Sequence, residues 1–189
     1  MKVRYSYLSQ QFSNCDDLWL KLKKFVKTGD FTLGKELTKF EQKFAKLIGT
    51  KYAVGVNSGT DAIKLSLKVI GIKPGDEIIT AANTFVATVG AICELGAKPI
   101  FVDCDDSFCI DTNLIEKKIN KKTKAIVPVH FTGYMTNMIK LNKIAKKYKI
   151  PIVEDACQSI LASINKKNSG TWSDFGAFSL HPLKNINVW

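Results

Sequence analysis

From Tyr52 onward, short apolar runs alternate with segments whose apolar residues recur at helical spacing. The predicted strands are 52–56, 77–80, 99–102, 125–129 and 150–154, and the predicted helices between them are 60–70, 85–95, 112–119 and 137–148. Parallel strands need a long crossover connection, and a helix usually supplies it. The alternation therefore predicts an α/β fold in which helices cover both faces of a mainly parallel sheet.

Two amphipathic helices are predicted before this pattern begins. The first runs from Asp16 to Lys27 and ends before a loop bracketed by Gly29 and Gly34. Apolar residues on one face of the second helix are predicted to be core, and they are Leu37, Phe40, Phe44 and Leu47. No repeat or low-complexity linker separates these helices from the rest, so we expect one domain over residues 1–189.

The net charge of +11 comes almost entirely from lysine, because Arg4 is the only arginine among 28 basic residues. Base reading and bidentate phosphate recognition favour arginine, so the charge indicates a solvated surface and no nucleic-acid partner. No apolar run is long enough to span a membrane, and the start, 1–7, lacks the apolar core of a signal peptide. We therefore expect a cytoplasmic protein without a membrane partner.

Metal binding is not predicted either. The five cysteines contain no CxxC pair, and His130 and His181 stand apart from them.

The stretch from Val54 to Asp61 combines a strand, a turn of small residues and the start of a helix. Backbone N–H groups at such a helix start, together with the hydroxyls of Ser58 or Thr60, suit a phosphate. The simpler interpretation is that Ser58 or Thr60 caps the helix. The chain has neither the dinucleotide-binding motif GxGxxG nor the P-loop motif GxxxxGK[ST]. The sequence therefore gives no support to the alternative of an unrelated α/β binding protein or oxidoreductase.

An acid and a lysine flank the last third of the chain. Asp155 follows the apolar pair Ile152-Val153, and α/β proteins bind ligands at the carboxyl ends of their strands. Lys184 follows a strand-like run, 176–180, and Pro182, where a partly desolvated amine could attack a carbonyl. Pyridoxal phosphate chemistry needs both groups, since the aldehyde requires an amine and the ring nitrogen an anion. Asp155 could instead cap a helix or form an ion pair, and most lysines are surface charges.

Three further residues each have two interpretations. Phe85, just past a predicted strand, could stack on a flat cofactor ring or belong to the core. Gln158 could contact a cofactor oxygen or bond to backbone. His130 could line the expected crevice between Asp155 and Lys184 or be a hydrogen-bonded structural histidine.

Taken together, these motifs resemble the DegT/DnrJ/StrS sugar aminotransferases, pyridoxal-phosphate enzymes of the aspartate aminotransferase fold (fold type I). The matching segments are Gly29–Gly34 with Phe40-Glu41, Ala53–Ala62, Pro74–Glu77, Ala82–Ala87, Pro128–His130, Glu154–Gln158 and Phe178–Asn185. They span nearly the whole chain.

The resemblance implies a role for each site residue. Lys184 would attach the pyridoxal 5′-phosphate and shuttle the proton during catalysis, and Asp155 would pair with the pyridine nitrogen. Gln158 would contact the ring oxygen and Phe85 would stack on the ring. The phosphate holders would be Gly59, Thr60 and Ser179.

The resemblance also implies an amino transfer, usually from glutamate, to a nucleotide-linked keto-sugar in amino-sugar or surface-polysaccharide biosynthesis, by a homodimer. The run 181–189 is similar to members that aminate C3 of a dTDP-linked 3-keto-6-deoxyhexose, while a 4-keto-sugar or a 3-keto-uronic acid stays open. Family members continue well past the lysine, so residues 1–189 are similar to an N-terminal part of the large, cofactor-binding domain. The alternative is an inactive remnant that only binds the cofactor or a partner.

Overall fold

The computed structural model describes residue 3 and residues 6–188, so Trp189 and most of the stretch 1–5 lie outside the described residues. The chain divides into two compact units, the residues up to Gly55 and Val56–Val188. Over the described residues, no helix combines the length and the apolar character needed to cross a membrane.

The first unit contains three helices, α1 (Leu8–Gln11), α2 (Asp16–Val26) and α3 (Lys35–Ile48). Both amphipathic helices are therefore confirmed. The predicted core face of α3 is wrong for Phe40 and Leu47, which are 38% and 44% exposed, whereas Ala45 and Ile48 are buried. The buried stripe of α3 follows the 3.6-residue period through positions one residue later than Phe40 and Leu47.

Residues 52–56 do not form the predicted strand. A strand needs a neighbour for its backbone groups, and none of the described residues pairs with this stretch. The N–H of Gly55 instead donates to the Glu41 carboxylate at 2.7 Å, and Val54 is 77% exposed.

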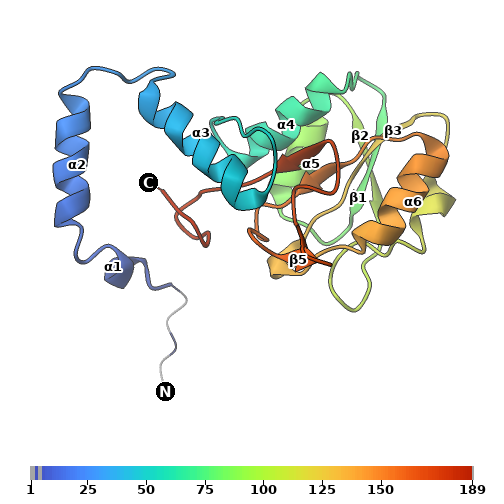
Figure 1. Ribbon diagram of the computed structural model, residues 1–189. Helices are drawn as coiled ribbons and strands as arrows, with labels where there is room; N and C mark the ends of the chain where they lie inside the picture. The colour runs from blue at the N-terminus through green and yellow to red at the C-terminus, as the bar shows by residue number, and fades with distance from the viewer. Residues whose placement is uncertain (1–2, 4–5, 189) are drawn as a thin grey trace. The chain divides into compact units, whose positions relative to one another are not determined.

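The second unit is built on parallel strands (Figure 1). In the three-stranded sheet, β1 (Glu77–Ala81) lies between β2 (Lys98–Val102) and β3 (Thr123–Val127), and both neighbours run parallel to it. Beyond β3, β4 (Val153–Asp155) pairs in parallel with β7 (Phe175–Ala177). These four predicted strands, 77–80, 99–102, 125–129 and 150–154, are confirmed with shifted ends.

Isolated parallel bridges join the three-stranded sheet to β4. One pairs Ile126 with Ile152, and the other pairs Val129 with Asp155. The carboxyl end of β4 is therefore held between the chain that follows β3 and strand β7.

Helices cover both faces of this sheet (Figure 1), as the sequence predicted. One face packs against α6 (Met138–Tyr148) through residues such as Ile79 and Ile126. The opposite face packs against α4 (Gly59–Val69) and α5 (Val86–Cys93). The predicted helix at 112–119 is only a short 3-10 turn, η1 (Ile115–Lys118).

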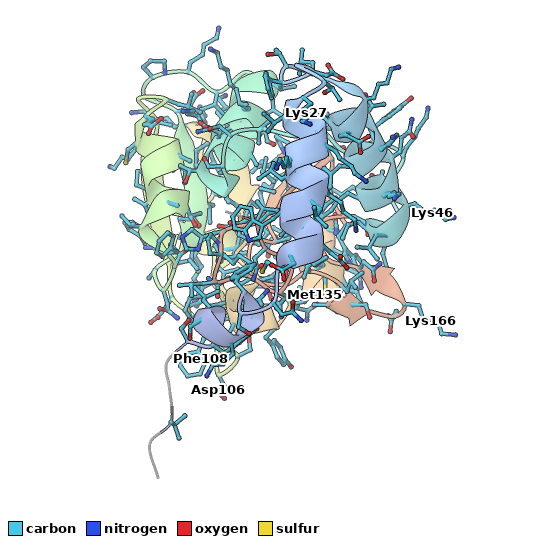
Figure 2. All side chains as sticks on the ribbon, turned by 90° about the vertical axis from the view of Figure 1, so that its left-hand side faces the viewer. Lys27, Lys46, Asp106, Phe108, Met135 and Lys166 are labelled. Carbon is cyan, nitrogen blue, oxygen red and sulfur yellow. The ribbon has the colours of Figure 1, made fainter. Side chains whose placement is uncertain are left out.

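A small hairpin between β4 and β7 was not predicted. It pairs β5 (Ser163–Ile164) with β6 (Lys167–Asn168). Its turn residues, Asn165 and Lys166, have φ of 51° and 64°. Figure 2 shows Lys166 at this turn with its side chain pointing outward. The pair Asn-Lys lacks the glycine that marks such a turn in a sequence.

Candidate active site

Strand β4 carries two neighbouring acids on opposite faces of the sheet, because side chains alternate along a strand. Val153 belongs to the core on the α4 and α5 side, so Asp155 points toward α5. The buried Asp155 carboxylate accepts a hydrogen bond from Thr88 Oγ1 at 2.7 Å and from the Cys157 N–H at 3.2 Å. Asp155 is the last residue of β4, so its predicted place at a strand end is confirmed. Among the described residues, no basic side chain forms an ion pair with it.

The start of α4 lies against the segments that follow β4 and β7. A Cβ added to Gly59 would be 2.8 Å from Cys157 Sγ and 3.1 Å from Ser179 Cβ. Only glycine therefore allows these three backbone segments to approach so closely. Gly59 and Ser179, both of which the family resemblance implies as phosphate-holding residues, are brought together here.

Ser58 caps α4, since its Oγ accepts the Asp61 N–H at 3.0 Å. The first intrahelical hydrogen bond runs from the Ala62 N–H to the Ser58 carbonyl. The N–H groups of Gly59 and Thr60 precede that bond and have no partner inside the helix. They form the positive end of the helix dipole, which favours an anion.

Lys184 and Asp155 both act on the thiol of Cys157. Burial and the negative charge of Asp155 raise the pKa of Cys157, and the positive charge of Lys184 lowers it. The Lys184 backbone is fixed by its N–H, which donates to the His181 carbonyl at 2.8 Å. Among the described residues, none forms a hydrogen bond or ion pair with the Lys184 amine, whereas the Lys184 carbonyl accepts from the side-chain N–H₂ of Asn187.

The remaining named residues are placed differently. Phe85 directly precedes α5 and is 63% exposed, so the core interpretation is wrong for it. Gln158 is held by backbone, because its side-chain oxygen accepts the Thr132 N–H at 3.0 Å. His130 is fully buried and is a structural histidine.

His130 bonds to Glu154, the other acid of β4. The distance from His130 Nε2 to Glu154 Oε2 is 2.9 Å, and both side chains are fully buried. His130 Nδ1 accepts the Thr136 N–H at 3.2 Å, so the ring proton is on Nε2 and points at the carboxylate. Glu154 belongs to one of the segments that carry the family resemblance, but the sequence predicted no role for it.

Glu154 also accepts hydrogen bonds from the segment that precedes β7. Its Oε2 accepts the Gly170 N–H at 2.8 Å. Its Oε1 accepts the N–H of Trp172 at 2.8 Å and both the N–H and the hydroxyl of Ser173, at 3.0 and 2.9 Å. A charged residue inside a buried strand was the one sequence signal that could have indicated this role, since buried acids are almost always paired.

This network predicts an acid-sensitive fold. Burial alone would raise the pKa of Glu154, but hydrogen bonds from His130, Gly170 and Ser173 outweigh it and hold the pKa below 4.5. Because the folded pKa is below the unfolded one, the stabilisation is present above about pH 4.5 and is lost as the pH falls through the folded pKa.

Urea unfolding followed by circular dichroism at several pH values measures this effect. We expect the urea concentration at half-unfolding to decrease once the pH is lowered below 4.5. In Glu154→Gln, whose side chain cannot ionise, we expect that part of the pH dependence to be absent. If the stability of the Glu154→Gln variant falls as steeply with acid as that of the unmodified chain, other carboxylates cause the acid sensitivity.

The sequence profile of the DegT/DnrJ/EryC1/StrS aminotransferases matches residues 16–189. The chain belongs to this family. It is 37% identical over 186 residues to the dTDP-3-amino-3,4,6-trideoxy-alpha-D-glucose transaminase of Micromonospora megalomicea subsp. nigra, covering 98% of this chain and 50% of that protein. It is also 37% identical over 182 residues to the UDP-2-acetamido-2-deoxy-3-oxo-D-glucuronate aminotransferase of Pseudomonas aeruginosa, covering 96% of this chain and 51% of the relative.

Solved structures of the family have the same fold. The structure of NtdA from Bacillus subtilis with bound cofactor PMP superposes with a TM-score of 0.93 at 37% identity, covering all of this chain and 43% of that one. The fold is thus that of the fold type I aminotransferases, as the resemblance implied. The chain spans about half the length of the relatives that it matches.

Proposed function

We propose that this DegT/DnrJ/EryC1/StrS family chain is the N-terminal part of the cofactor-binding domain of a sugar aminotransferase that uses pyridoxal 5′-phosphate. One observation carries the proposal: the Gly59 turn and the buried Asp155 carboxylate both contact Cys157, and the positive charge of Lys184 lowers the pKa of the same thiol. A pyridine nitrogen, a phosphate and an aldehyde are the groups that these three features suit.

The residues fit the cofactor one by one. The N–H groups of Gly59 and Thr60, with Ser179, would hold the phosphate, because donors at a helix start bind anions. Asp155 would hold a proton on the ring nitrogen, and the exposed ring of Phe85 would stack on the cofactor. The cofactor supplies an electron sink for the carbon that loses or gains the amine.

Lys184 would attach the cofactor and then carry a proton, and Gln158 would use its amide N–H₂ toward the ring oxygen. The amide of Gln158 has this donor left because its oxygen is already engaged by Thr132. Its orientation is thereby fixed before a ligand arrives.

The substrate class follows from the relatives. Their names describe transaminases of dTDP- and UDP-linked sugars with nitrogen at C3 or with a 3-oxo group. We propose a nucleotide-linked keto-sugar as the acceptor, aminated at C3, with glutamate as the amino donor and a cytoplasmic homodimer as the working form. The resemblance of the motifs supports these finer assignments.

Covalent capture of the cofactor tests the proposal. The chain is mixed with pyridoxal phosphate and reduced with borohydride, and its tryptic peptides are analysed by mass spectrometry. We expect one reduced cofactor on the peptide that contains Lys184 and none after Lys184→Ala. The matched control is Lys121→Ala, since Lys121 is an exposed lysine outside the site, and it should still be labelled at Lys184.

Labelling spread over many lysines, or equal labelling of the Lys184→Ala variant, would contradict the proposal. Turnover is tested separately, by the formation of 2-oxoglutarate from glutamate and a dTDP-linked 3-keto-6-deoxyhexose. Cofactor capture without turnover would favour the alternative, a protein that binds the cofactor only.

A further inference from the structure

A directed chain of hydrogen bonds leads to the carboxylate of Asp155. Thr88 is fully buried, and its Oγ1 lies 2.7 Å from Asp155 Oδ2 and 2.8 Å from Thr84 Oγ1. A hydroxyl has a single proton, and an ionised carboxylate can only accept. Thr88 therefore donates to Asp155, and Thr84 donates to Thr88.

The fold holds Thr88 and Asp155 in place. Thr88 lies in the first turn of α5, where its N–H donates to the Phe85 carbonyl at 3.1 Å. The Asp155 backbone is fixed by its N–H, which donates to the Pro128 carbonyl at 2.9 Å, and by its carbonyl, which accepts the His130 N–H at 3.0 Å.

The two carboxylate oxygens of Asp155 have separate donors. Oδ2 is held by the Thr88 hydroxyl, and Oδ1 by the Cys157 N–H. Two donors on two oxygens fix the plane of a carboxylate, and a buried group held in this way is oriented before a ligand binds.

We propose that Thr88 is a positioning residue for the cofactor: its hydroxyl fixes the Asp155 carboxylate in the orientation that meets the pyridine nitrogen. The inference rests on the proposed function and adds to it a residue that does not touch the cofactor. Thr84 extends the same chain to the residue next to Phe85, so the proposed ring-stacking residue and the proposed acid are linked through two hydroxyls.

The test compares two ligands that differ only at the ring nitrogen. Pyridoxal phosphate and its 1-deaza analogue, in which a C–H replaces that nitrogen, are titrated into the apo chain, and dissociation constants are measured by fluorescence. The variants are Thr88→Val, which removes the hydroxyl at nearly constant shape, and Thr88→Ser, which keeps it.

We expect Thr88→Val to weaken pyridoxal phosphate binding roughly tenfold, because a hydrogen bond to a charged group is among the stronger ones. Binding of the deaza analogue should be unchanged, because it has no nitrogen for Asp155 to meet. Thr88→Ser should bind both ligands as the unmodified chain does.

The outcomes separate the two proposals. If the unmodified chain does not bind pyridoxal phosphate, the proposed function fails whatever Thr88 does. If it binds and Thr88→Val binds equally well, or loses both ligands equally, the role of Thr88 is overturned. Should circular dichroism show that Thr88→Val is unfolded, Thr88→Ala, which also removes the hydroxyl, replaces it: a loss confined to pyridoxal phosphate supports the role, and any other result overturns it.

Discussion

Replacing Glu154 by alanine should lower the free energy of unfolding by about 4 kcal/mol. The change removes the acceptor for His130 Nε2, for three backbone N–H groups and for the Ser173 hydroxyl. Buried donors that lose their acceptor keep the cost of desolvation without the compensating bond. Urea unfolding monitored by circular dichroism measures the loss.

Two variants control for this effect. Glu154→Gln retains one acceptor oxygen but points an N–H₂ at donors, so we expect a smaller loss than with alanine. Glu116→Ala removes an exposed acid whose partner is Lys147, at 2.7 Å, and should change the midpoint little. Equal midpoints for Glu154→Ala and Glu116→Ala would show that the Glu154 network does not hold the fold.

Gly176→Ala, which adds a single methyl group, should strongly destabilise the second unit. A Cβ at Gly176 would lie 2.4 Å from the Cα and 2.5 Å from the carbonyl oxygen of Gly170. Both are backbone atoms, so no side-chain rotation relieves the clash, and we expect a loss of about 3 kcal/mol. The displaced Gly170 would also take its N–H away from Glu154.

Gly90→Ala is the matched control with the opposite sign. Gly90 lies inside α5, and a Cβ there would meet nothing within 4 Å. Alanine is the better helix former, so this variant should gain about 0.5–1 kcal/mol. If both glycine variants unfold at the same urea concentration, the close approach of Gly170 and Gly176 carries no energetic cost.

The sequence predicted the parallel sheet well because its strands and helices carry local signals. The predicted strands 77–80, 99–102 and 125–129 are apolar runs bounded by glycine or polar residues, and each overlaps an observed parallel strand. Asp155 was found because the end of an apolar run marks the end of a strand. The error at 52–56 has the opposite cause, since an apolar run predicts a strand only if another strand lies beside it.

The contacts around the site had no such signal. Thr88 is one threonine in an apolar helix, and only the packing of α5 on the sheet brings it to Asp155. The backbone groups that donate hydrogen bonds to Glu154 lie in a loop 16–19 residues further along the chain. Hydrogen bonds over such separations follow from tertiary structure and cannot be read from spacing.

The last two residues of β4 are acids whose side chains lie on opposite faces of the sheet. Glu154 accepts hydrogen bonds from the loop before β7 on one face, and Asp155 faces α5 on the other. Side chains along a strand alternate, so sliding β4 by one residue against its neighbours would exchange the two carboxylates. Inserting or deleting one residue between Ile150 and Asp155 would thus turn the structural acid toward α5. The chain should accept a lengthened hairpin at Lys166 far more readily than any change in the length of this short strand.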